Sequence, residues 1–338
     1  MYKVTLSMPI YNVAPYVERA LLSALNQTFE SIEFLLVDDR GTDNSMEIVR
    51  RIIKDHPRGK DVRIIEHPHN IGTGATKNTA IDNAQGEYLF FMDSDDEITP
   101  DCIQILYDKM KEYPVDFVVG SYQTINWNQE SQKIIFEDLV LKGNNCLSNL
   151  VYKKMFFFPI TSWNKLYRMS FLRNNNIRCY PKHLNEDHIF SRWIIYYTKS
   201  CSFTSTETLI YYRRDNSTTG SIKFNTFSYR NADEHLEIAE NFKLLLSYYE
   251  KTELYNFYQI WLIKCLSSFF CAYYNSHVIK LKDKMLYNRK LSEFKFDFLS
   301  MLNTSYSKKN LWYIFFLKAP FCIKAILYKM YKYYSLIK

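Results

Sequence analysis

Strand and helix patterns alternate four times in the first hundred residues, and this alternation limits the fold more than any other feature of the chain. Short runs rich in apolar residues predict strands at Val4–Ile10, Ile32–Val37, Val62–Glu66 and Tyr88–Met92. Helical patterns separate them, starting near Ala14, spanning Met46–Lys54 and running through Lys77 to Ala84. Parallel strands joined by helices make right-handed crossovers. We therefore expect an α/β fold with a Rossmann-like, mostly parallel sheet and helices on both faces.

Acidic residues follow two of the predicted strands directly. Asp39 comes after the second strand, and Asp93, Asp95 and Asp96 come after the fourth. Open α/β sheets bind ligands at the carboxyl ends of their strands. Because Asp93 and Asp95 are two residues apart, they project to the same side of an extended backbone and suit Mg²⁺ or Mn²⁺ bound to a diphosphate. The alternative is a solvated acidic loop that caps a helix starting near Pro100.

Five groups of residues occur in the order and spacing found in family 2 glycosyltransferases. They are Ser7-x-Pro9-x-Tyr11-Asn12, Gln27-Thr28, Val37-Asp38-Asp39 with Thr42-Asp43, Asn70-x-Gly72 with Lys77-Asn78, and Asp93-x-Asp95-Asp96. The chain resembles this family densely over residues 1–125 and more thinly to about residue 220. The resemblance implies an inverting enzyme with a GT-A fold, which binds nucleotide-diphospho-sugars, and a cofactor of Mn²⁺ or Mg²⁺. It also implies a role in bacterial surface-glycan assembly.

The resemblance assigns roles on the donor side of the site. Pro9 and Tyr11 would pack against the nucleotide base, with the aromatic face available for stacking. Asp39 would accept a hydrogen bond from the imino N–H of the base, which uracil and thymine carry, so the expected donor is a UDP- or dTDP-sugar. Asp93 would lie beside the ribose and the metal, and Asp95 would bind the metal that holds the diphosphate.

Two cations are expected to reach the diphosphate. Lys77 stands in Thr76-Lys77-Asn78, where many family members have arginine, and it supplies a point charge without bidentate geometry. Arg213 belongs to a segment that resembles the end of the acceptor region, in a loop that is expected to close on the donor. Either cation could instead be a solvated surface charge.

The resemblance also places an acid pair, Glu186 and Asp187, at the start of a helix under the acceptor site. An acceptor hydroxyl has a high pKa, so its attack on the sugar needs a carboxylate to take the proton. Asp187 is the expected base and Glu186 the second choice. The alternative is that both acids only stabilise a helix N-terminus. Trp163 could stack on an acceptor sugar ring or belong to the core.

The character of the sequence changes after residue 225. Helical periods cover Ala232–Glu250 and Tyr255–Asn275. Residues 298–338 contain seven lysines and no acid, so the rest of the chain carries 36 charges of each sign. We expect a donor-binding subdomain over residues 1–125, an acceptor-binding subdomain over 126–225 and a helical basic region over 226–338. The basic tail is expected either to lie on an anionic membrane surface or to pack as a helical subdomain or dimer surface.

Composition excludes several kinds of site, location and partner. Seven cysteines without a Cys-x-x-Cys pair indicate reduced thiols and argue against a zinc site or a disulfide framework. No signal peptide and no apolar stretch of about 18 residues is found, so we expect a cytoplasmic protein, peripheral on the inner face of the membrane if the tail binds lipid. Because the excess positive charge is confined to the tail, we expect no nucleic-acid partner.

The expected reaction moves a sugar from a nucleotide diphosphate to the hydroxyl of a saccharide or lipid-linked saccharide. A nucleotidyltransferase is an alternative, although such an enzyme usually has a Gly-rich basic loop after the first strand, which Pro9-Ile10-Tyr11-Asn12 is not. A non-catalytic, membrane-associated scaffold with the same fold is the alternative from another class.

Overall fold

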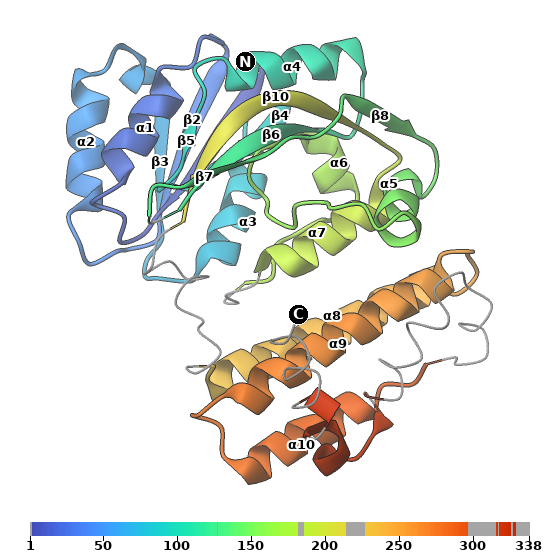
Figure 1. The fold of residues 1–338 in the computed structure, drawn as a ribbon. Coiled ribbons are helices and arrows are strands. Elements are labelled where there is room, and N and C mark those ends of the chain that lie inside the picture. The colour runs from blue at the N-terminus through green and yellow to red at the C-terminus, as the bar shows by residue number, and fades with distance from the viewer. Residues whose placement is uncertain are drawn as a thin grey trace. The chain divides into compact units, whose positions relative to one another are not determined.

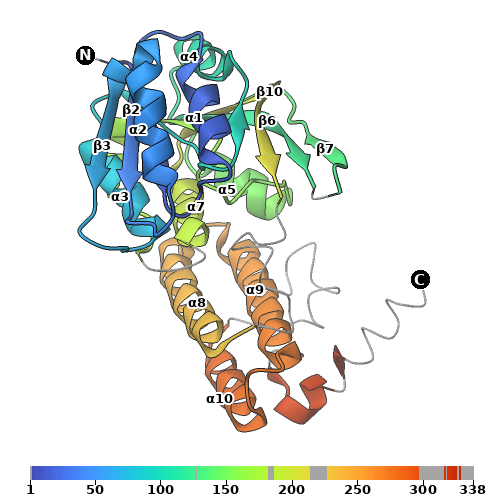
Figure 2. The same ribbon diagram turned by 90° about the vertical axis from the view of Figure 1, so that its left-hand side faces the viewer.

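The computed structural model describes residues 2–126, 128–181, 186–213, 227–296, 316, 318–325 and 327–328. The chain divides into two compact units (Figures 1 and 2). Unit 1 consists of Met1–Ser148 and Phe158–Asp215, and unit 2 consists of Asn149–Phe157 and Asn216–Lys338.

Unit 1 is built on one mixed sheet with the strand order β3-β2-β1-β4-β9-β6-β10-β5. Its first half is parallel, as the sequence predicts, and it contains β1 (Val4–Ile10), β2 (Ile32–Asp38), β3 (Val62–Glu66) and β4 (Tyr88–Phe91). Every residue of β2 is buried, because helices cover both faces of this part of the sheet. All four strands therefore direct their carboxyl ends to the same edge.

Helices connect these parallel strands. The connecting helices are α1 (Val17–Leu25), α2 (Ser45–Asp55) and α3 (Thr73–Asn83). Figure 1 shows α1 and α2 on one face of the sheet and α3 on the other. The first helix begins three residues later than predicted. The N–H groups of Val13 and Ala14 donate instead to the side chains of Ser45 and Asp43, both at 2.9 Å, and this holds the start of α1 in a turn.

The second half of unit 1 extends the sheet with antiparallel and mixed pairing. Its elements are β5 (Glu97–Ile98), α4 (Cys102–Glu112), β6 (Phe117–Ile125), β7 (Ser131–Ile134), β8 (Leu139–Lys142), α5 (Cys146–Ser148), β9 (Lys165–Arg168), α6 (Met169–Asn174), α7 (Glu186–Tyr197) and β10 (Ser200–Tyr212). Strand β9 runs antiparallel to both β4 and β6 and so joins the two halves. Strand β10 ends beside β5, next to the acidic loop.

Unit 2 is helical in its described part. It contains a π-helical turn (Asn149–Lys153), α8 (Tyr229–Tyr249), α9 (Tyr255–Asn275) and α10 (Leu281–Ser292), so the two helices predicted in this region are present. Aromatic rings fill its core: Tyr152, Tyr249, Tyr258 and Trp261 have centroid separations of 4.9 to 6.0 Å. A search of the described residues finds no helix with the length and apolar character of a membrane span.

Most of the basic tail lies outside the described residues. Two of its lysines are described, and both contact the end of α10. The ammonium of Lys318 donates to the carbonyls of Ser292 and Phe294, and that of Lys324, which is fully buried, donates to Asn288 at 2.6 Å. Burial, together with nearby Lys318, lowers the pKa of Lys324 to about 8. These contacts fit the alternative of a helical subdomain, and membrane binding by the tail stays a prediction.

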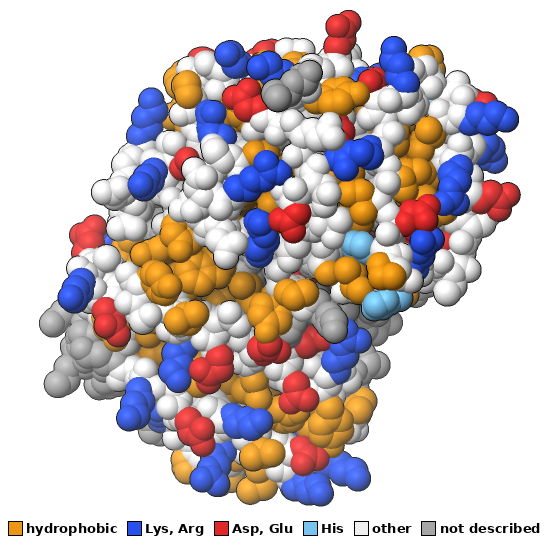
Figure 3. All heavy atoms as spheres, turned by 180° about the vertical axis from the view of Figure 1, so that it is seen from behind, with side chains coloured by type: hydrophobic (Ala, Val, Ile, Leu, Met, Phe, Trp, Pro, Cys, Tyr) orange, Lys and Arg blue, Asp and Glu red, His pale blue; other side chains and the backbone are white. Residues whose placement is uncertain are grey.

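Charges of both signs are interspersed on the face of the molecule drawn in Figure 3. This matches the balance of acidic and basic residues outside the tail. All seven cysteines are free thiols.

Candidate active site

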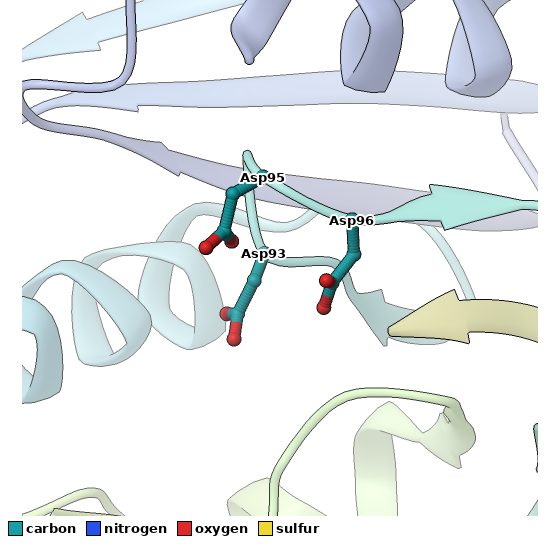
Figure 4. Close-up of side chains that lie close together, drawn as sticks. All are labelled: Asp93, Asp95 and Asp96. Atoms are coloured by element: carbon teal, nitrogen blue, oxygen red, sulfur yellow. The ribbon is translucent and has the colours of Figure 1, made fainter. Parts of the chain in front are cut away.

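The acidic loop of residues 93–96 leaves the sheet at the carboxyl end of β4. The N–H of Met92 still donates to the carbonyl of Ser7 at 2.9 Å, so pairing with β1 continues up to the loop. Carboxylate oxygens of Asp93, Asp95 and Asp96 lie within 4.8 Å of one another. Figure 4 shows that the three carboxylates point to the same side of the loop. Such a set of oxygen donors fits a hard divalent cation.

Asp96 differs from the other two acids in its surroundings. It is fully buried, and its carboxylate accepts the N–H of Tyr212, at the end of β10, at 3.0 Å. Asp93 and Asp95 are partly exposed. We therefore interpret Asp96 as the residue that ties the loop to β10, while Asp93 and Asp95 are placed to bind a cation.

Arg19 of α1 holds the acidic loop from another direction. Its guanidinium donates to the backbone carbonyl of Asp95 at 2.8 Å, pairs with Glu97 at 2.9 Å and lies 3.7 Å from the ring centroid of Tyr212. The Tyr212 hydroxyl in turn donates to Glu97 at 2.6 Å. This network links α1, the acidic loop and β10. Sequence reasoning missed Arg19, because the residue belongs to no motif and meets the loop only in the folded chain.

A buried ion cluster joins α3 to α7. The ammonium of Lys77 lies 2.9 Å from a carboxylate oxygen of Glu186 and 2.9 Å from one of Asp187. Lys77 is 3% exposed. Burial disfavours its charge, but Asp187, Glu186 and Asp93 together raise the pKa of Lys77 well above its ordinary value. Lys77, which the sequence predicts as a diphosphate cation, thus contacts the acid pair that contains the predicted base.

The acidic loop and the ion cluster share one electrostatic environment. The pKa of Asp93 is raised to about 7: burial is the largest cause, Lys77 opposes it, and Asp95, Asp187 and Glu186 add to the rise. Burial also raises the pKa of Glu186, against the effect of Lys77. Residues predicted separately for the metal and for the acceptor are therefore close enough to influence one another's ionisation.

The start of α3 also positions the chain that leads into α7. Asn78 exchanges two hydrogen bonds with the backbone of Cys179, each of 2.8 Å. A Cβ atom at Gly74 would lie 2.1 Å from the carbonyl oxygen of Tyr180, so only glycine allows this approach. These contacts hold Cys179 and Tyr180 against α3.

Asp39 lies directly after β2 and is 2% exposed. Its carboxylate accepts the N–H groups of Ile71 and Gly72, both at 2.9 Å, and lies 2.8 Å from Nδ1 of His67. The residue thus fixes the loop that precedes α3. Because a carboxylate has about four acceptor positions, a further donor can still bind, and recognition of the base stays a prediction.

A cleft of about 160 Å³ opens at the carboxyl ends of β1 and β2. Its lining includes Tyr11, Asn12, Asp38, Arg40 and Arg50. The Tyr11 side chain is 45% exposed, which leaves its ring available for stacking on a flat ligand. Pro9 is partly exposed nearby on β1. Of the residues predicted to contact the base, Tyr11 lines this cleft whereas Pro9 and Asp39 do not, and the roles of all three remain predictions.

The two remaining predicted residues lie at the ends of β9 and β10. Trp163 is 4% exposed, with its ring stacked on Tyr211 at 5.5 Å and set edge-on to Tyr122 at 5.1 Å. This placement fits the core role, and contact with an acceptor stays a prediction. Arg213 is exposed, and its N–H donates to the carbonyl of Ile125 at 2.8 Å. The polar run of residues 216–220, predicted to form a loop that closes on the donor, lies outside the described residues.

The chain is similar in sequence to several known proteins. Residues 5–173 match the sequence model described as glycosyl transferase family 2. The chain is 32% identical over 215 residues to glycosyltransferase GlyA of Streptococcus pneumoniae serotype 4, which covers 59% of this chain and 30% of GlyA. It is 30% identical over 190 residues to an uncharacterized glycosyltransferase of Haemophilus influenzae, which covers 55% of this chain and 69% of that protein.

A third relative is the poly(ribitol-phosphate) beta-glucosyltransferase of Bacillus spizizenii, 34% identical over 194 residues that cover 56% of this chain and 29% of that enzyme. The chain thus spans less than a third of the length of GlyA and of the Bacillus spizizenii enzyme. The structure of S. aureus TarS 1–349 in complex with UDP-GlcNAc superposes with a TM-score of 0.60 at 18% identity, covering 94% of this chain and 90% of TarS 1–349. This likeness confirms the predicted GT-A fold.

Proposed function

Because the chain belongs to glycosyl transferase family 2, we propose that it transfers a sugar from a nucleotide diphosphate to a hydroxyl group with inversion at the anomeric carbon. The observation that carries the proposal is the meeting of two acidic groups at one edge of the sheet. Asp93 and Asp95 supply carboxylates at the end of β4, and Glu186 and Asp187 supply carboxylates at the start of α7. A donor diphosphate and an acceptor hydroxyl need these two kinds of site side by side.

On the donor side, Asp93 and Asp95 would hold Mn²⁺ or Mg²⁺. When bound there, the cation neutralises charge that develops on the diphosphate as the bond to the sugar breaks. Arg19 and Asp96 keep the acidic loop in place through their contacts with Asp95 and Tyr212. At the other end of the donor, Tyr11 would stack on the base and Asp39 would accept its imino N–H.

On the acceptor side, Asp187 would accept the proton of the attacking hydroxyl. The oxygen then forms its bond to the anomeric carbon from the face opposite the diphosphate, and the nucleotide diphosphate leaves with the electron pair of the broken bond. The Asp187 side chain is 19% exposed, whereas that of Glu186 is 9% exposed, so Asp187 is more accessible to an acceptor. Lys77 contacts both acids, and at Glu186 it opposes the rise in pKa that burial causes.

For the donor nucleotide we propose uridine diphosphate. The carboxylate of Asp39 suits a base with an imino N–H, and TarS, with the same fold, has been solved with UDP-GlcNAc. The proposed acceptor is a saccharide or lipid-linked saccharide of the bacterial surface, at the cytoplasmic side of the membrane. The family match does not favour a nucleotidyltransferase.

The test combines binding with turnover. With Mn²⁺ present, UDP should raise the melting temperature of the protein more than GDP or CMP, because a ligand that binds only the folded state stabilises it. Release of UDP from a panel of UDP-sugars should then require Asp95. The variant Asp95→Asn should lose activity and the UDP-dependent stabilisation, whereas Asp108→Asn, which changes an exposed carboxylate on α4, should keep both. If no nucleotide diphosphate stabilises the protein, the proposal fails.

A further inference from the structure

Helix α10 presents an exposed side that is both apolar and basic. Leu281, Met285 and Leu286 are 65%, 52% and 50% exposed. Lys282, Arg289 and Lys290 are exposed among them. We call these six residues the α10 face. At about 100° per residue all six fall on one half of the helix circumference.

The orientation of α10 follows from its other side. Tyr287 is 6% exposed, Asn288 7% and Leu291 1%. Tyr287 donates to Asp233 of α8 at 2.7 Å, and Asn288 accepts from the buried ammonium of Lys324 at 2.6 Å. The packed side of α10 is thus occupied within unit 2, and the α10 face points away from that core.

Helix α10 itself carries few acidic side chains. Within α10 the sole acid is Asp283, which is partly buried and accepts the hydroxyl of Tyr229 at 2.7 Å. Glu293, just after the helix, lies 3.7 Å from Arg289. Neither Lys282 nor Lys290 forms an ion pair with an acid in the described part of the chain. The face therefore keeps an excess of positive charge.

We propose that the α10 face binds an anionic lipid surface, with the helix lying in the plane of the headgroups. Leucine and methionine side chains would enter the boundary of the acyl chains, and the lysine and arginine side chains would reach the headgroup phosphates. Each basic residue near such a surface strengthens binding about fivefold. The inference does not depend on the proposed reaction.

Two other occupants fit the charges less well. A second copy bound through the same face would set lysine and arginine against lysine and arginine, because a twofold interface brings each patch onto itself. Residues 298–338 of this chain carry seven lysines and no acid, so they would not complement the α10 face either. An anionic surface satisfies both the charge and the exposed apolar side chains.

Helix α8 offers a matched control. Leu244 and Tyr248 are 52% and 45% exposed, so this surface is also apolar. Its exposed neighbours include Glu237, Glu240 and Glu250. An anionic membrane would repel such a surface, so changing its apolar residues should leave lipid binding intact.

The experiment is co-sedimentation of the full chain with vesicles of phosphatidylcholine alone and of phosphatidylcholine with phosphatidylglycerol. We expect binding to the anionic vesicles only, and release at high salt. The variant Lys282→Gln/Arg289→Gln/Lys290→Gln should bind about 100-fold more weakly, and Leu281→Gln/Leu286→Gln about tenfold more weakly. The control Leu244→Gln/Tyr248→Gln should bind like the wild type. Melting temperature and release of nucleotide with a soluble acceptor should stay unchanged in all three variants.

Three results would overturn the inference. The wild type could fail to bind anionic vesicles, or the α10 variants could bind as tightly as the wild type, which would leave lipid binding to the basic tail. Sedimentation velocity could also show a dimer that the α10 variants abolish and that does not respond to lipid, which would make the face an interface between copies.

Discussion

Replacement of Lys77 by methionine tests the buried ion cluster most directly. Lys77 contacts Glu186 and Asp187 at 2.9 Å each and is 3% exposed. The variant leaves these carboxylates without their cation, and breaking a buried pair in this way costs about 3–5 kcal/mol. In a domain of roughly 150–250 residues, 1 kcal/mol lowers the melting temperature by about 2–4 °C, so we expect a loss of about 6–20 °C.

The stability that Lys77→Met loses relative to wild type should increase with pH. The pKa of Asp93 is raised by burial to about 7, and that of Glu186 is also raised. An acid with a higher pKa in the folded state binds more protons there, so its contribution to stability falls as pH rises through that folded pKa. Lys77 lowers both pKa values, and its removal raises them further. The variant should therefore be least stable relative to wild type near pH 8, and the difference should shrink toward pH 5.5.

The measurement is urea unfolding of wild type and Lys77→Met at both pH values. Lys3→Met, which breaks an exposed pair with Glu87, serves as the control and should cost less than about 1 kcal/mol. The triple variant Lys77→Met/Glu186→Gln/Asp187→Asn should recover much of the lost stability, because no unpaired charge remains in the cluster. If Lys77→Met is as stable as wild type near pH 8, the ion cluster does not contribute as argued.

Three further predictions concern single residues of unit 1. Asp187→Asn should lower kcat by about 10²–10⁴-fold while UDP still stabilises the protein; an unchanged kcat would remove Asp187 as the base. Arg19→Met should raise the Mn²⁺ concentration needed for half-maximal activity by about 10–100-fold, as loss of an outer contact to a metal site does, whereas Arg51→Met, at an exposed pair with Glu18, should not. Burial lowers the pKa of Lys165 to about 7, so above that pH the folded state binds fewer protons than the unfolded state, and the stability of the wild type should rise between about pH 7 and 9. Urea unfolding of Lys165→Met should show no such rise. An equal rise in both proteins would contradict the lowered pKa of Lys165.

The first four strands and the three helices between them followed from local pattern. The strands Val4–Ile10 and Val62–Glu66 have their predicted bounds, because apolar runs and turn residues act over a few neighbouring positions. The position of the acids in residues 93–96 also follows from such a pattern, because these acids come directly after an apolar run in the sequence. The prediction that Asp93, Asp95 and Asp187 belong to one site rested on the resemblance to a family.

The partners of the charged side chains were decided by tertiary structure alone. Lys77 meets Glu186 across 109 positions of the chain, and Arg19 meets the carbonyl of Asp95 across 76. Lys324 lies in a tail that has seven lysines and no acid, yet it is fully buried against α10. Composition and spacing report how a residue relates to its neighbours in sequence. Which distant carboxylate it reaches, and whether water reaches it too, depends on how the helices and the sheet pack.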